Sequence, residues 1–310
     1  MLLKNTKTKI AFLMLCTFCF QFACSINRYR QPILKFQAAS ALVTANARSS
    51  LMEVNRLQIS RVITEKRLKG QDITNKDIEG AKLITFEDLQ VRLDALDRVN
   101  EYADLLVSIA NSDAPENIAK SATDLNTAIG QLNTTVMNLS GNTTPTNFKG
   151  AFSLAGSVLS EILRAVAQKK IKEALDTAIL KGEKPVNTLI DAIANDLSVA
   201  YDVKNSGFFK LEEALIAAYK LEAAKDSPSE AKLTDLANKI NANRDVIEIL
   251  QFANPKDSLT QMKKTHSKLV IHAKTKTPAS FADAVEEIEV FVAAVKRLGD
   301  AVQELKKQNI

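Results

Sequence analysis

The sequence has little aromatic or nucleophilic chemistry: it contains no tryptophan, two histidines and three cysteines in 310 residues, and aromatic residues make up only 5%. Scarce aromatics without interleaved basic residues do not form the stacking surface that single-stranded nucleic acids require. Glycine-rich phosphate loops, the G-x-S-x-G nucleophile elbow and the H-E-x-x-H zinc motif are also absent. We therefore expect no enzymatic activity, no cofactor, no metal site and no nucleic-acid partner.

All three cysteines lie within the first 24 residues, and two of them, Cys16 and Cys19, have CxxC spacing. That spacing indicates a zinc or redox site only beside further ligands or a βαβ unit, and the sequence has neither. The pair instead lies in an uncharged apolar run, residues 10–23, which is shorter than the ~20 residues of a membrane span. A basic start followed by a short apolar run is typical of a secretory signal, so we expect residues 1–23 to be a signal peptide. The basic residues before the run are Lys4, Lys7 and Lys9.

The third cysteine, Cys24, directly follows Ala23 at the end of the apolar run. This arrangement resembles the bacterial lipoprotein signal, in which a small residue precedes a cysteine that is acylated and becomes the new N-terminus. Gln21 and Phe22 stand where that family usually has leucine and a small residue. The resemblance covers the first 24 residues and implies a lipid on Cys24 and membrane attachment in the cell envelope, in the periplasm or at the outer membrane. The alternative is a secreted protein cleaved after Ser25, because Ala23 and Ser25 match the small-residue spacing of an ordinary signal-peptidase site.

The net charge of +5 is unevenly distributed along the chain. Three of the positive charges belong to the signal segment, which leaves only +2 for the remainder and little support for a nucleic-acid partner. Residues 28–69 contain nine Lys or Arg against two acids, whereas residues 72–124 contain twelve acids against five bases. We expect these segments to be neighbouring helices with matching charged flanks. The alternative is a basic first helix that lies on anionic lipid beside the anchor.

The chain has nine glycines and seven prolines, no strand-type alternation and many apolar residues at spacings of three and four. This pattern predicts an all-α fold: an elongated antiparallel bundle of about seven to nine long helices with coiled-coil-like heptad seams. We expect the bundle to occupy residues 35–310 after a short tether at 24–34. Two halves of the bundle could meet near 141–150.

Caps and helix breakers predict the helix boundaries. We expect helices over 32–69, 74–110, 113–141, 148–182 and 186–225, the last interrupted or kinked at 205–207, followed by helices that begin at the caps Ser227, Asn254 and Thr277.

The apolar spacing also predicts which residues are buried. In the second helix, Asn100 is the one polar member of the seam, with the role of a register-setting buried amide. The third helix has a seam that includes Leu125, Ile129 and Leu132. The last helix has a stripe of Phe281, Val285, Ile288, Val292, Val295 and Val302.

The two histidines, His266 and His272, are six residues apart, so they point to different faces of a helix and do not share one metal ion. His266 is in register with Met262 and Leu269. We expect it to be a core or boundary imidazole whose polar atoms are hydrogen-bonded.

These features together favour an exported, lipid-anchored helical bundle of the cell envelope that acts as a structural or protein-interaction module for an unidentified envelope protein. The alternative is a membrane-perturbing toxin that resembles, in general build, the cytolysin-A family of α-helical pore formers. Its candidate insertion segment is 148–167, which includes Lys149, Glu161 and Arg164. Charged residues are costly on a surface that faces lipid.

Overall fold

The computed structural model describes residues 6–82, 86–111, 120 and 171–308, and those residues form seven helices and no strand. The prediction of an all-α helical bundle is therefore confirmed. The helices are α1 (Thr6–Leu68), α2 (Asn75–Ala81), α3 (Phe86–Ala110), α7 (Ile171–Ala223), α8 (Glu230–Phe252), α9 (Lys256–Thr275) and α10 (Pro278–Lys307).

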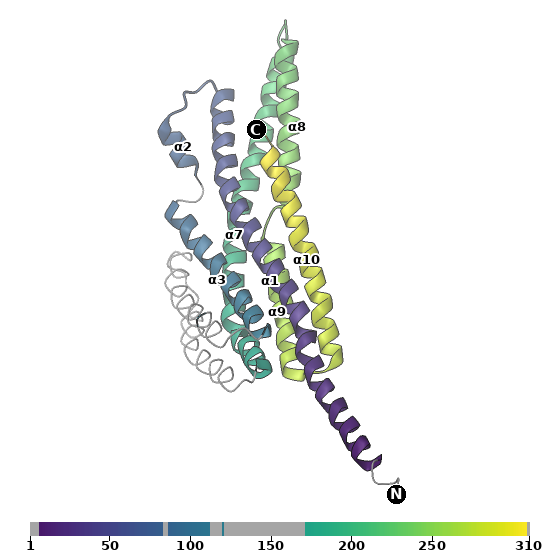
Figure 1. The fold of residues 1–310 in the computed structure, drawn as a ribbon. Helices are drawn as coiled ribbons and strands as arrows, with labels where there is room; N and C mark the ends of the chain where they lie inside the picture. The colour runs from purple at the N-terminus through teal and green to yellow at the C-terminus, as the bar shows by residue number, and fades with distance from the viewer. Residues whose placement is uncertain (1–5, 83–85, 112–119, 121–170, 309–310) are drawn as a thin grey trace.

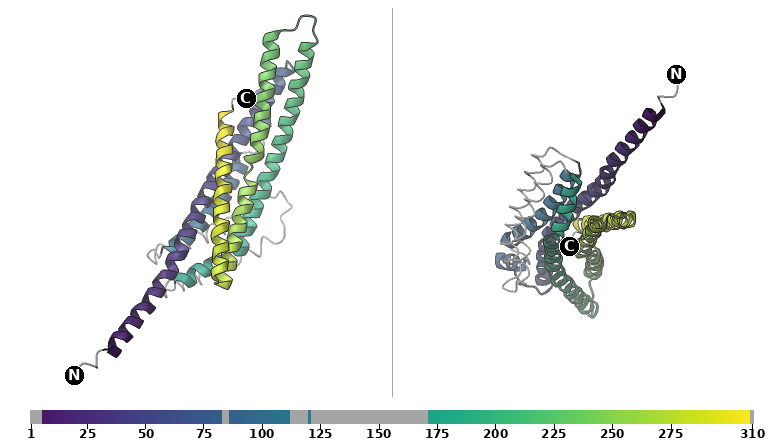
Figure 2. Two further views of the ribbon diagram at one scale, coloured as in Figure 1. Left: turned by 90° about the vertical axis from the view of Figure 1, so that its right-hand side faces the viewer. Right: turned by 90° about the horizontal axis from the view of Figure 1, so that it is seen from below.

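The bundle is elongated, and the long helices α1 and α7 run along most of it (Figures 1 and 2). Helices α8 and α9 follow one another end to end and pack along α7 in the opposite direction. Helix α10 then returns beside α9 and runs in the same direction as α1, its neighbour. We call the end with the α9–α10 turn the proximal end and the end with the α7–α8 turn the distal end.

One continuous apolar core extends along the bundle, and a small second cluster lies near the distal end. The clearest buried stripe belongs to α10, where buried residues follow one another at alternating steps of four and three: Ala284, Ile288, Phe291, Val295, Leu298, Val302 and Leu305. Burial of Ile288, Val295 and Val302 confirms half of the predicted stripe. The prediction is wrong for Val292, which is 37% exposed, because Phe291 faces the core instead.

Three predicted helix boundaries are confirmed. Helix α1 ends at Leu68, two residues before Gly70, whose φ of +63° suits glycine. Thr74 caps α2 in a capping box: its side chain accepts from Asp77 N, and the Asp77 carboxylate accepts from Thr74 N at 2.9 Å. Thr277 caps α10 by accepting from the backbone N–H of Ser280 at 3.1 Å.

Helix α1 begins at Thr6 rather than at residue 32, so the predicted tether, residues 24–34, is helical. Its second half already belongs to the core, because Tyr29 and Ile33 are buried. The predicted helix over 74–110 is two helices, since α2 ends at Ala81 and α3 begins at Phe86.

Helix α7 runs without a break past residues 182–185 and 205–207, where we predicted breaks. Both glycines lie where a neighbouring side chain comes very close. A Cβ added to Gly182 would be 2.7 Å from the ring of Tyr102, and one added to Gly207 would be 2.8 Å from Arg61 Nε. These glycines therefore allow close packing and do not end a helix.

Two other predicted caps are shifted along the chain. The N-cap of α8 is Ser229, not Ser227, and it accepts from Lys232 N at 3.4 Å. Helix α9 begins at Lys256, and the side chain of Asn254 accepts from the Lys256 backbone N–H at 3.0 Å without being the N-cap residue.

Asn100 does not occupy the centre of a seam. It is half-buried, and its side chain donates to Asp104 at 3.4 Å. The buried face of α3 includes Val99, Tyr102 and Leu106, because α3 packs against both α1 and α7 and so buries a wider arc than one seam.

Several predictions lie outside the described residues. They are the helix over 113–141, apart from Lys120, with Leu125, Ile129 and Leu132, the junction near 141–150, and the candidate insertion segment 148–167. Residues 148–170 of the helix predicted over 148–182 also lie outside the described residues.

The predicted matching of charged flanks is confirmed where the two segments are described. Arg48 on α1 and Asp97 on α3 form an ion pair at 2.6 Å, and Lys66 pairs with Asp77 on α2 at 2.7 Å. Such exposed or partly exposed pairs contribute little to stability because water screens their charges, so they orient the helices more than they stabilise them.

Candidate functional site

The N-terminal part of α1 projects beyond the proximal end of the bundle (Figures 1 and 2). Cys24 lies on this part of the helix, five residues before Tyr29, which is the first core residue among the side chains that the structure describes. At a rise of 1.5 Å per residue, that interval corresponds to about 7 Å along the helix axis. The predicted lipid-attachment position therefore lies close to the proximal end of the bundle.

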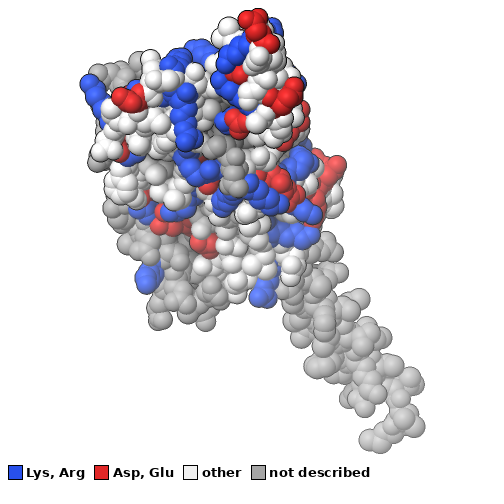
Figure 3. Space-filling model, turned by 90° about the horizontal axis from the view of Figure 1, so that it is seen from above, with Lys and Arg blue, Asp and Glu red and all other residues white. Residues whose placement is uncertain are grey.

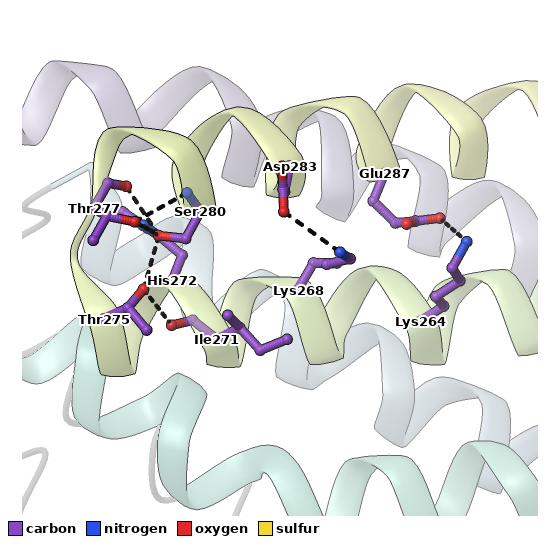
Figure 4. Close-up of polar contacts among 9 residues, drawn as sticks. All are labelled: Lys264, Lys268, Ile271, His272, Thr275, Thr277, Ser280, Asp283 and Glu287. Atoms are coloured by element: carbon purple, nitrogen blue, oxygen red, sulfur yellow. Dashed lines mark hydrogen bonds and ion pairs between the residues drawn. The ribbon is translucent and has the colours of Figure 1, made fainter.

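A polar cluster closes the core at this proximal end. The Tyr29 hydroxyl is hydrogen-bonded to His272 Nε2, and His272 Nδ1 is 2.8 Å from Ser280 Oγ. Ser280 in turn donates to the carbonyl of Thr277 at 2.9 Å, and Figure 4 shows these residues at the turn between α9 and α10. The network is satisfied throughout if Tyr29 donates to Nε2 and the imidazole carries its proton on Nδ1. It joins the start of the core on α1 to a turn more than 240 residues later.

Asp176 on α7 lies beside this cluster and is only 5% exposed. Lys276 Nζ is 2.9 Å from its carboxylate. Burial and the negative charge of Asp176 together raise the pKa of Tyr29 to about 12. Burial lowers the pKa of His272, although Asp176 acts in the opposite direction. The Tyr29 hydroxyl and the His272 imidazole therefore stay neutral at neutral pH.

The second histidine forms a similar pair deeper in the bundle. His266 is fully buried; its Nε2 is 2.7 Å from the Tyr102 hydroxyl and its Nδ1 is 3.0 Å from Asn187 Oδ1. Because the amide oxygen only accepts, Nδ1 carries the proton and Nε2 accepts from Tyr102. Burial lowers the pKa of His266 to about 4. The prediction that His266 is a hydrogen-bonded core residue is confirmed.

Both Tyr–His pairs tie helices together through buried side chains. Helices α9 and α10 are further joined on the surface by the ion pairs Lys264–Glu287 at 2.9 Å and Lys268–Asp283 at 3.6 Å (Figure 4). Within the described part of the chain, no group of three or more His, Cys, Asp or Glu side chains is placed to hold a metal ion.

The distal end carries a groove of about 400 Å³ between α1, α7 and α8, which we call the distal groove. Its apolar lining includes Leu68, Leu221 and Leu236, and two acids, Glu222 and Asp235, also line it. Figure 3 looks down on this end, and basic side chains gather toward the middle of the view. The basic residues of the groove are Arg67, Lys225, Lys232 and Lys239.

Glu222 organises the α7–α8 turn beside the distal groove. Its side chain is 3% exposed and binds Lys225 Nζ at 2.7 Å and Lys232 Nζ at 2.8 Å. It also accepts from the backbone N–H of Ser229 at 3.3 Å. These hydrogen bonds lower the pKa of the Glu222 carboxyl to about 2. One carboxylate thus holds two lysines, so the groove keeps an excess of positive charge.

A second groove, of about 710 Å³, lies between α1 and α7. Arg61 lies across Gly207 in its wall and is bound by Gln58 Oε1 at 3.1 Å and by Glu65. Because the guanidinium already has these partners, this groove has a mixed polar surface and no free arginine at its centre.

Comparison of the chain with known protein families, curated proteins and solved structures found no match. Among the described residues, no helix combines the length and the apolar character needed to cross a membrane.

Sequence reasoning identified Cys24 and the two histidines, but it missed Tyr29, Asp176 and the distal groove. Tyr29 and Asp176 meet His272 only through the packing of α1, α7 and α9, and nothing in the local pattern marks them. The groove had a partial signal in the leucines and lysines at helical spacing on both sides of the α7–α8 turn.

Proposed function

We propose that this protein is an exported, lipid-anchored helical bundle of the bacterial cell envelope and acts without catalysis as a structural or protein-interaction module. The observation that carries the proposal is the order of features at the N-terminus: a basic start, a short apolar run and Cys24, followed five residues later by the buried core residue Tyr29.

A lipid on Cys24 would hold the bundle directly at the membrane surface. Residues 24–34 are helical and partly packed, so the chain offers no long flexible tether between the lipid and the core. An anchored bundle would stand with its proximal end near the membrane and present the distal end to other envelope proteins. The distal groove is thus placed for an interaction away from the membrane.

Metabolic labelling with radioactive palmitate tests the anchor, and the chain supplies its own matched controls. We expect label on the wild-type protein and on the Cys16→Ala and Cys19→Ala variants, and no label on Cys24→Ala. An unlabelled mature wild-type protein that begins at Ile26 would instead demonstrate cleavage after Ser25 and a secreted protein.

A liposome-leakage assay at neutral and acidic pH separates this proposal from the pore-forming alternative. An interaction module leaves the dye inside the vesicles, whereas dye release at micromolar protein would favour the toxin. The candidate insertion segment, 148–167, lies outside the described residues, so no structural observation favours the alternative.

A further inference from the structure

We propose that the distal groove binds an acidic amphipathic helix of a partner protein. The proposal rests on the function proposed above, because it names the kind of partner that an interaction module with this surface would take. It is argued from the position of the groove in the bundle, its length and its charge.

The distal groove lies where a fourth helix would pack against α1, α7 and α8. Nearer the proximal end, α10 packs against both α1 and α8, and each of these two helices also packs against α7. Helix α10 ends at Lys307, where Arg56 of α1 donates to the carbonyls of Leu305 and Gln308, at 3.4 Å each. Thr64 and Arg67, which line the groove, lie two to three turns further along α1. Figure 2 shows the α7–α8 hairpin continuing past the end of α10, so a bound helix would extend the column that α10 begins.

The length of the groove suits a short helix. Its walls span residues 218–225, at the end of α7 and in the turn that follows, and residues 232–239 of α8. The α8 wall is about two turns or ~10 Å long. A ligand helix of three turns carries apolar side chains at positions i, i+3 or i+4, and i+7 on one face, and that face would lie against the apolar lining of the groove. Leu221 is the exposed apolar residue available to them, since it is 72% exposed, whereas Leu236 is buried beneath.

The charge of the groove favours an acidic ligand. Four basic residues line it against two acids. Lys225 and Lys232 share the single carboxylate of Glu222, and Lys239 pairs with Asp235 at 2.6 Å. Arg67 is exposed, and no ion pair among the described residues includes it. Glutamates along the flanks of a bound helix would pair with the basic side chains of the groove, whereas a basic helix would be repelled by them.

The test uses two fluorescent synthetic helices with the same leucine positions, one flanked by glutamate and one by lysine, and the full chain in lipid-free buffer. We expect the acidic peptide alone to raise the fluorescence anisotropy. Leu221→Asp should weaken this binding by about tenfold or more, because it removes a central apolar contact and adds a repelling charge. Leu42→Asp is the matched control: Leu42 is 55% exposed on the middle of α1, and its substitution should leave binding unchanged. Both substitutions are at exposed positions, so both variants should fold, and circular dichroism verifies this.

Other outcomes would overturn the proposal. Equal binding of the lysine peptide, or unchanged binding by Leu221→Asp, would show that the groove does not recognise acidic helices. Self-association that Leu221→Asp abolishes would assign the groove to a second copy of this chain, and binding of laurate without either peptide would assign it to an anionic lipid. Lipidation of Cys24 affects none of these readouts, so failure here and failure of the palmitate experiment are separate results.

Discussion

The buried imidazole of His266 should make the stability of this protein fall as the pH is lowered from 7 to 5. In the folded chain its pKa is about 4 because of burial, whereas an unfolded histidine has a pKa near ~6.5. Between these values the unfolded chain binds a proton that the folded chain does not, so acidification favours unfolding. The stabilising contribution is complete above pH ~6.5 and is lost progressively as the pH falls toward 4.

The magnitude follows from ~1.36 kcal/mol per pKa unit. Between pH 7 and pH 5, His266 should reduce the free energy of unfolding by about 2 kcal/mol. At an unfolding entropy of ~2.1 cal/mol/K per residue, this corresponds to a decrease in melting temperature of roughly 3 °C for a chain of 310 residues. The carboxyl groups of Asp77 and Glu222 have strongly lowered pKa values and titrate below this range. In the unfolded chain their carboxyl groups titrate near pH ~4, also below this range, so Asp77 and Glu222 add little to the expected slope.

Thermal or urea unfolding at pH 7, 6 and 5 measures this slope in the wild type and in His266→Gln, which keeps hydrogen-bonding groups but does not titrate. We expect the variant to be less stable overall but to lose about 2 kcal/mol less than the wild type between pH 7 and 5. His272→Gln is the comparison variant, with a smaller change in slope, because the charge of Asp176 opposes the effect of burial on the pKa of His272. If His266→Gln and the wild type lose the same stability, then the imidazole is not held neutral by burial and the reasoning is refuted.

Three further predictions concern single contacts, each measured as a change in the free energy of urea unfolding. Gly182→Ala should destabilise the fold by about 1–3 kcal/mol, because the added methyl group would lie against the ring of Tyr102. Gly80→Ala is the control, since a Cβ added there meets nothing, and it should destabilise little or not at all. Equal losses in the two variants would contradict the packing argument. Thr277→Ala should cost ~1 kcal/mol by removing the α10 cap, and Thr277→Ser should restore most of it; a neutral Thr277→Ala would show that the turn does not depend on this hydrogen bond. Arg48→Ala should cost no more than ~1 kcal/mol, since its pair with Asp97 is exposed, and a loss of several kcal/mol would mean that α1 and α3 depend on that pair.

Local sequence signals were sufficient for the features that depend on a few neighbouring residues. The all-α class follows from apolar spacing and the lack of strand alternation, and the Thr74 and Thr277 caps follow from hydrogen bonds within one turn of helix. Burial of His266 follows from its register with Met262 and Leu269. Each of these features is set within a single helix, so the sequence alone was enough.

Only the tertiary structure decided the features that depend on residues far apart in the chain. The sequence predicted that Gly182 ends a helix, but α7 continues through it. The ring of Tyr102, from α3, lies against Gly182, so the glycine serves close packing between helices. Tyr29 meets His272 across 243 residues, and no local pattern encodes such a pairing. The distal groove exists because α10 stops short of the turn between α7 and α8. Where packed helices stop relative to one another is set by the alignment of whole helices. Helix propensity and capping act over one or two turns, whereas close approach, pairing and helix alignment arise only when the whole chain packs.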